Sequence, residues 1–135
     1  EAMLAVEAVA PAIEIIDSRY KNFKFSLADV VADNCSSSGF VLGAWQNLDA
    51  DLSNLGMILE VNGRPVQIGS SAAILGHPAR SLAAAARLSS EAGEPLQAGW
   101  IVMAGGATAA EALAPGNSVR NVVQELGFTG FSVTA

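Results

Sequence analysis

The dipeptide Asn62-Gly63 constrains the fold of this chain more than any other local feature. It separates two apolar runs, residues 55–61 and 64–69. Asn-Gly is a preferred pair for the two-residue turn in which both positions have positive φ, and this turn joins antiparallel strands. The sequence therefore predicts a β-hairpin here.

Other helices and strands are expected on both sides of this hairpin. Apolar residues at helical spacing, with Pro11 ending the first helix and Gly93 capping the last, indicate three helices. Runs rich in β-branched and aromatic residues indicate strands. The helices are expected at 1–10, 27–32 and 79–92, and the strands at 12–18, 40–45, 100–104, 119–126 and 128–134. We therefore expect an α+β domain with many short strands curled around one core.

The composition favours one domain that contacts another polypeptide. The 135 residues are 51% hydrophobic and 15% charged, with a mean hydropathy of +0.39. This length allows one sizeable core, so a single domain is expected over residues 1–135. A monomer of this size normally exposes more charge, so we expect a homo-oligomer.

Charge and cysteine content exclude several classes of function. The net charge of −6 and the dispersed basic residues argue against binding to nucleic acid or an anionic membrane. No apolar stretch approaches the roughly 18–20 residues of a membrane span, and Cys35 alone cannot form an internal disulfide. A cytoplasmic protein is expected. Because the chain begins with Glu1 in what reads as the middle of a helix, we also expect an upstream segment.

The residue inventory restricts the possible chemistry. One histidine and one cysteine cannot form a zinc site of the Cys/His kind, so any metal must be a hard cation such as Mg²⁺, with Mn²⁺ as a possible substitute. The motifs of common hydrolases, P-loop proteins and dinucleotide-binding proteins are absent. The most unusual residue is Glu14, an acid among isoleucines. It either binds a cation or pairs with a base, or it is an ordinary strand glutamate that points to solvent or bridges to Arg19.

Two loops and one histidine have alternative interpretations. Asn34 and the serines at 36–38 offer hydrogen-bonding groups for a substrate carboxylate, although ordinary turn chemistry explains them as well. The turn at 105–108 allows a ligand to approach the backbone closely, or is simply a tight turn. His77, just before a predicted helix, is interpreted as a capping residue rather than a base.

Four segments together resemble one known family. They are Ala-Ile-Glu-Ile-Ile-Asp-Ser-Arg-Tyr-Lys-Asn-Phe-Lys-Phe (12–25), Val-Val-Ala-Asp-Asn-Cys-Ser-Ser (30–37), Leu-Gly-His-Pro (75–78) and Gly-Gly-Ala-Thr-Ala-Ala (105–110). In order and spacing these segments are similar to the hydratase/decarboxylase family of the fumarylacetoacetase-like superfamily, which handles 2-oxo and 2-hydroxy dienoates from catechol meta-cleavage. The resemblance runs through essentially the whole chain but matches only the C-terminal half of a family member.

The resemblance implies a fold and a site. The fold would be a fumarylacetoacetase-like mixed β-roll or sandwich with a few packed helices, as the C-terminal catalytic part of a longer enzyme. Glu14 would be one of three carboxylate ligands to Mg²⁺, whereas a Glu-x-Glu pair and a catalytic lysine would lie upstream. The pocket would include Asn34, Ser36, Gly106 and Thr108.

The resemblance also implies a reaction. The segments at 17–25 and 105–110 look more like the decarboxylase branch, which implies Mg²⁺-dependent conversion of 2-oxo-3-hexenedioate, a dicarboxylate, to 2-hydroxypenta-2,4-dienoate and CO₂ in aromatic catabolism. One alternative is a hydratase that acts on 2-hydroxypenta-2,4-dienoate with the same metal site. Another is a non-catalytic half that completes an oligomer or binds a homologous hydratase.

Overall fold

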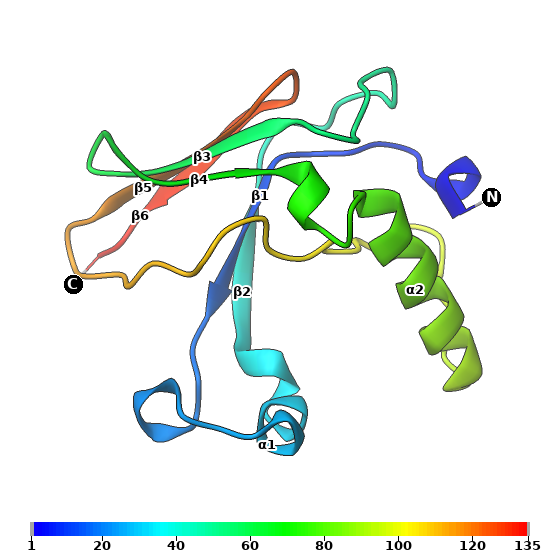
Figure 1. Ribbon diagram of the computed structural model, residues 1–135, viewed down its shortest axis with the longest axis horizontal. Coiled ribbons are helices and arrows are strands. Elements are labelled where there is room, and N and C mark those ends of the chain that lie inside the picture. The colour runs from blue at the N-terminus through cyan, green and yellow to red at the C-terminus, as the bar shows by residue number, and fades with distance from the viewer. Residues whose placement is uncertain (1, 135) are drawn as a thin grey trace.

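The strands of this chain form two antiparallel sheets in the computed structural model, which describes residues 2–134 (Figure 1). The larger sheet has the order β4-β3-β5-β6, and the smaller one pairs β1 with β2. Two α-helices and short 3-10 turns complete the structure, and the expected α+β class is confirmed. The bounds are β1 (Ala12–Ile16), α1 (Leu27–Ala32), β2 (Ser37–Leu42), β3 (Gly56–Val61), β4 (Arg64–Ser70), α2 (Pro78–Glu91), β5 (Ser118–Val123) and β6 (Gly127–Ser132).

The predicted hairpin is confirmed. Asn62 and Gly63 have φ of 52° and 73°, and Val61 pairs with Arg64 on either side of them. Strands β3 and β4 therefore meet through the two-residue turn that Asn-Gly favours. The two predicted closing strands are also confirmed as β5 and β6. Strand β5 ends earlier than expected because residues 124–126 form the turn between the two strands, and β6 ends at Ser132.

The longest helix, α2, begins and ends where its sequence signals lie. The Nδ1 atom of His77 accepts a hydrogen bond of 3.0 Å from the Ala79 amide, and Pro78 is the first helical residue. Proline suits this position because its missing N–H would have no partner there. Gly93 follows the helix with a φ of 83°. The interpretation of His77 as a capping residue is thus confirmed.

Two predicted elements are wrong. Of the helix expected at 1–10, only a 3-10 helix (Ala2–Ala5) forms within the described residues, because Val9 exchanges backbone hydrogen bonds with Gln46 and is extended. The strand expected at 100–104 has no partner strand, and Trp100 is 57% exposed. An apolar run supplies the side chains of a buried strand, but it does not provide a neighbour to pair with.

The loop expected at Asn34 and the serines at 36–38 is only partly confirmed. Strand β2 begins at Ser37, within this expected loop, because Ser37 pairs with Ile16. The strand expected at 40–45 therefore starts three residues earlier and ends at Leu42. Backbone pairing with β1 overrides the low strand preference of the serines.

The buried core is small and one face of the structure is open. Leu55, Val123 and Leu126 form the buried cluster, and Leu52 and Met57 pack against it. Beside it lies a largely apolar concave region of about 1580 Å³, lined by residues from β1, β3, α2 and the extended segment 95–113. An apolar surface of this kind fits the expectation that another polypeptide covers it, and the homo-oligomer stays a prediction. None of the helices described in residues 2–134 could span a membrane.

The hydroxyl of Ser71 holds the buried cluster to the end of β4, and this predicts a stability effect. Ser71 is 1% exposed, accepts a 2.7 Å hydrogen bond from the Leu55 amide and donates one of 2.8 Å to the Leu52 carbonyl. Ser71→Ala leaves both backbone groups without that partner, so we expect a loss of about 1–3 kcal/mol.

Denaturant unfolding measures this loss, and Ser90→Ala on the exposed surface of α2 is the control. That control should change the free energy of unfolding by less than about 0.5 kcal/mol. Equal effects of the two substitutions would contradict the role assigned to the Ser71 hydroxyl.

Candidate active site

Glu14 lies on the wall of the concave region. Its isoleucine-rich surroundings form β1, which pairs antiparallel with β2 so that Glu14 lies opposite Phe40. The side chain is exposed, and the Ser37 hydroxyl lies 3.5 Å from its Oε1. Arg19, which the sequence offered as a possible partner, pairs with Asp33 instead. The carboxylate is therefore available to a ligand in the concave region.

The carboxylate of Glu14 fits part of a hard-cation site. Mg²⁺ prefers carboxylate oxygens and keeps several waters or substrate oxygens as further ligands. Within residues 2–134, no group of three or more histidine, cysteine, aspartate or glutamate side chains lies close enough to hold a metal ion. A cation site at Glu14 would therefore need further ligands from outside the described residues.

The turn at 105–108 lies on the same concave region and is held by β4. Gly105 has a φ of 110°, and Gly106 and Thr108 both line the region. A Cβ atom at Gly69 would lie 2.5 Å from the Ala107 carbonyl oxygen, so β4 and this segment are in direct backbone contact. The side-chain amide of Gln67 on β4 also donates to the Glu111 carboxylate. Strand β4 thus sets the position of the turn.

The turn between α1 and β2 has an unusual backbone. Asn34, Cys35 and Ser36 have φ of 49°, 54° and 59°, three consecutive residues in the left-handed region. This conformation costs about 1–2 kcal/mol for each residue other than glycine, so neighbouring contacts must hold it. Asn34 is exposed, whereas Ser36 is 2% exposed with its hydroxyl 3.5 Å from the Asp33 carboxylate.

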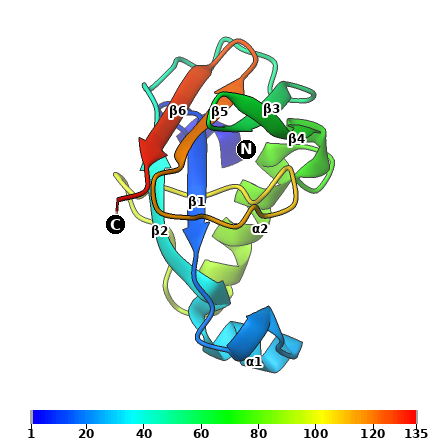
Figure 2. The same ribbon diagram turned by 90° about the vertical axis from the view of Figure 1, so that its left-hand side faces the viewer.

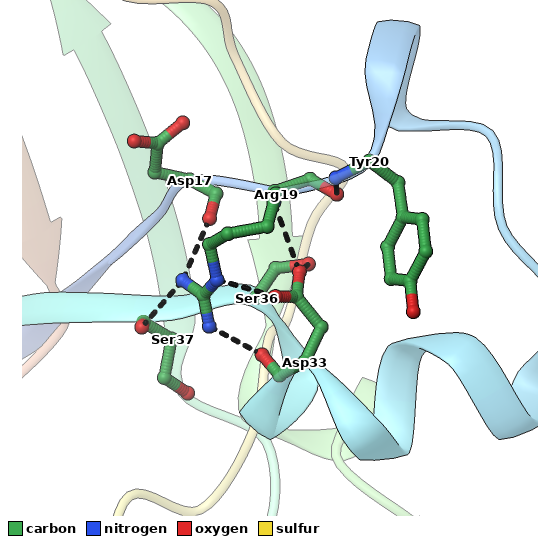
Figure 3. A network of polar contacts seen from close by, with 7 residues as sticks. Asp17, Arg19, Tyr20, Asp33, Ser36 and Ser37 are labelled. Carbon is green, nitrogen blue, oxygen red and sulfur yellow. Dashed lines mark hydrogen bonds and ion pairs between the residues drawn. The ribbon is translucent and has the colours of Figure 1, made fainter.

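A network around Arg19 and Asp33 surrounds this turn (Figure 3). The guanidinium donates through Nε to the Asp33 carboxylate and through the second terminal nitrogen to the Asp33 carbonyl at 2.5 Å. The other terminal nitrogen donates to the carbonyls of Asp17 at 3.0 Å and Ser37 at 3.4 Å. The side chain of Asp33 is 6% exposed and that of Arg19 is 52% exposed. The buried carboxylate is therefore fully partnered.

The structure brings only some of the predicted site residues together. Glu14, Gly106 and Thr108 line one concave region, whereas Asn34 and Ser36 do not line it and lie at the start of β2. The β1–β2 pair extends away from the larger sheet, with α1 at its far end (Figure 2). Sequence reasoning missed the roles of Asp33 and Gly69. A glycine within a β-strand is a weak sign of close backbone approach, and no local signal pairs Arg19 with Asp33, 14 residues away.

Comparisons with known proteins agree with the resemblance seen in the sequence. Residues 1–134 match the model of the fumarylacetoacetate (FAA) hydrolase C-terminal family. The chain is 63% identical to a 4-oxalocrotonate decarboxylase of a Pseudomonas species over 99% of this chain and 52% of that protein. It is 40% identical to a 2-keto-4-pentenoate hydratase of Paraburkholderia xenovorans strain LB400, over 87% of this chain and 44% of the hydratase.

A solved structure extends this similarity to the fold. It is the 4-oxalocrotonate decarboxylase from Pseudomonas putida G7 complexed with magnesium and adipate, with a TM-score of 0.93 and 44% sequence identity. The match covers 98% of this chain and 51% of the decarboxylase. The chain therefore spans about half the length of the relatives that it matches.

The capping box before α1 predicts a measurable pH effect. Hydrogen bonds from the Ser26 amide at 2.9 Å and from the Ser26 hydroxyl at 2.8 Å hold the pKa of Asp29 below its ordinary value. Because the folded pKa is the lower one, this contribution to stability is present above the unfolded pKa of Asp29 and is lost as pH falls through the folded pKa.

We expect Ser26→Ala to raise the pKa of Asp29 part of the way toward its ordinary value, because the amide hydrogen bond remains. An NMR titration of the Asp29 side-chain carbon measures this change. The Asp51 carboxyl, whose lowered pKa depends on Ser53, serves as an internal control and should not move. An unchanged pKa of Asp29 would show that the hydroxyl does not contribute.

The contact of β4 with the turn at 105–108 predicts that Gly69→Ala displaces this turn. The added methyl would overlap the Ala107 carbonyl oxygen and would lie 2.7 Å from Thr108 Cγ2. We expect a destabilisation of about 1–3 kcal/mol and faster amide exchange in residues 105–111.

Gly39→Ala is the matched control because Gly39 also lies in a strand but has no atom within 4 Å of its Cβ position. Hydrogen exchange with mass spectrometry compares the two variants. The same exchange in both would argue against Gly69 as the support of the turn.

Proposed function

This chain belongs to the fumarylacetoacetate (FAA) hydrolase C-terminal family, and we propose that it forms the C-terminal catalytic part of a Mg²⁺-dependent carbon–carbon lyase. The proposed reaction is the decarboxylation of 2-oxo-3-hexenedioate to 2-hydroxypenta-2,4-dienoate and CO₂ in the catabolism of aromatic compounds. The observation that carries the proposal is the exposed Glu14, which lines the same concave region as the turn at 105–108.

The relatives support the decarboxylase over other reactions. Identity to a named 4-oxalocrotonate decarboxylase is 63%, against 40% for the named hydratase. The similar solved structure holds magnesium and adipate, and adipate is a six-carbon dicarboxylate like the proposed substrate. A divalent cation and a dicarboxylate are thus compatible with this fold.

Each residue would have a distinct role in the proposed site. Glu14 would hold the cation. The bound cation would polarise the substrate's 2-oxo group, so that this group can accept the electron pair of the carbon–carbon bond that breaks when CO₂ leaves. The backbone at Gly106 and the hydroxyl of Thr108 would orient the substrate. Asn34 would offer its amide to a carboxylate only if its turn moved to the concave region, which it does not line in this structure. Ser36 would contact substrate only if its hydroxyl left Asp33, because it is buried in this structure.

The protein segment outside residues 2–134 would supply the remaining parts. These are the other carboxylate ligands and the catalytic lysine that the family resemblance implies. A cytoplasmic location and a homo-oligomer that covers the concave region are also part of this proposal, together with a complex with the homologous hydratase. The exposed apolar lining of the concave region supports a covering polypeptide.

The hydratase reading is the second candidate, and the 40% identity to a hydratase favours it. A hydratase would add water to 2-hydroxypenta-2,4-dienoate at the same cation. The two reactions separate by product: full-length enzyme with 2-oxo-3-hexenedioate should release CO₂ with Mg²⁺ and not without it. Hydration of 2-hydroxypenta-2,4-dienoate without CO₂ release would place the protein among the hydratases.

Replacing Glu14 tests the metal-ligand role. In the full-length enzyme, Glu14→Gln keeps the size of the side chain but removes its charge, so Mg²⁺-dependent turnover should fall by more than about 100-fold while the fold is retained. CO₂ release at saturating Mg²⁺ and circular dichroism measure the two properties. Glu94→Gln, at an exposed position after α2, is the matched control and should leave turnover unchanged. Full turnover of Glu14→Gln would reject the assignment.

A further inference from the structure

We propose that the Arg19–Asp33 pair is a positioning device that fixes the turn of Asn34, Cys35 and Ser36 relative to the strand of Glu14. Neither Arg19 nor Asp33 lines the concave region, so the pair does not face the proposed substrate space. Both act through the backbone around them. Only the kinetic consequence of this proposal rests on the proposed function.

The pair stabilises a backbone conformation that its residues disfavour. Three consecutive residues with positive φ, none of them glycine, would relax toward ordinary conformations without external contacts. The Ser36 amide donates to the Asp33 carbonyl at 2.9 Å, and the guanidinium of Arg19 donates to the same carbonyl at 2.5 Å. The carbonyl that closes the turn is therefore held from outside the turn.

The same contacts join the two strands on either side. The Asp17 amide, just after β1, donates to the Ser36 carbonyl at 2.8 Å, and Arg19 reaches the carbonyls of Asp17 and Ser37 (Figure 3). The pairing of Ile16 with Ser37 is the last of the β1–β2 ladder, and the register shifts there. The guanidinium thus connects the end of β1 to the start of β2 at the point where their regular pairing ends.

The geometry requires arginine rather than a positive charge alone. Three nitrogens of one planar guanidinium donate to a carboxylate oxygen and three carbonyl oxygens. A lysine has one ammonium group and cannot occupy these directions together. The Arg19 backbone amide also donates to Asp33 Oδ2 at 3.0 Å, so both oxygens of the carboxylate accept hydrogen bonds from Arg19.

The connection to the site runs through Ser37. Its hydroxyl lies 3.5 Å from Glu14 Oε1, and its backbone carbonyl accepts from Arg19. A shift of the turn would therefore move the Ser37 hydroxyl away from its position beside the proposed cation ligand. The expected consequence is weaker substrate binding with cation binding retained, because the polar group beside Glu14 moves while Glu14 itself stays in β1.

The test compares Arg19→Gln and Arg19→Lys with Arg87→Gln in the full-length enzyme. Arg87 also forms an ion pair, with Glu91 on exposed α2, and is a matched control. Hydrogen exchange with mass spectrometry reports on residues 33–37. In both Arg19 variants we expect exchange in residues 33–37 to rise about tenfold or more, while exchange in α2 stays unchanged. In Arg87→Gln, exchange in residues 33–37 should equal that of the wild type. Arg19→Lys keeps the positive charge, so it provides the test if Arg19→Gln does not fold.

Kinetics provide the second measurement. We expect kcat/KM to fall by about 10- to 100-fold in the Arg19 variants, mainly through KM, with the Mg²⁺ concentration for half-maximal turnover unchanged. Unchanged exchange in residues 33–37 would overturn the proposal, as would faster exchange with unchanged kcat/KM, or faster exchange throughout the domain. If the wild-type enzyme releases no CO₂, the proposed function is rejected but the role of the pair is not, because the exchange measurement still tests that role.

Discussion

The pairing of β1 with β2 is the interaction on which the candidate site depends. It places Glu14 opposite Phe40 and returns the chain, through α1 and the left-handed turn, to Ser37. Successive side chains of a strand point to opposite faces, so a shift of one residue in this register would move Glu14 to the other face of the β1–β2 pair and away from Ser37. The register and the Arg19–Asp33 pair therefore act together, since one aligns the strands and the other holds the connection between them.

The open concave region is the second physical constraint. A chain with 51% hydrophobic and 15% charged residues must bury apolar surface, yet only a few large apolar side chains are buried in the described residues. Part of the remaining apolar surface, including Trp100 and Ile101, lines a region that also contains Glu14, Gly106 and Thr108. A polypeptide covering this region would bury the apolar surface and also enclose the proposed site. Exclusion of water strengthens the interactions of a charged group with its ligands, so the two effects favour the same arrangement.

The elements predicted correctly are those with signals in adjacent residues. The hairpin at Asn62-Gly63 and the helix between His77 and Gly93 depend on φ preferences and on backbone groups within a few residues. The helix expected at 1–10 rested on apolar periodicity and on Pro11 as its end, and the strand expected at 100–104 rested on its apolar run. Their conformation depends on partners distant in sequence: Val9 is extended because Gln46 pairs with it, and residues 100–104 lack a strand to pair with.

The α+β class, the hairpin at Asn62-Gly63, the long helix, the family and the choice of Glu14 as a candidate residue could all be predicted from the sequence. Each follows from local propensities or from motifs that stand in one stretch of chain. The folded structure was needed to show which candidates share a surface, that Ser36 is buried, and that Arg19 pairs with Asp33 rather than Glu14. The reason is that contacts between residues 14 or more positions apart depend on strand register and chain path. An example is the 3.1 Å hydrogen bond from Asn121 to the Ala12 carbonyl, which joins the two sheets across 109 residues and has no local signal in the sequence.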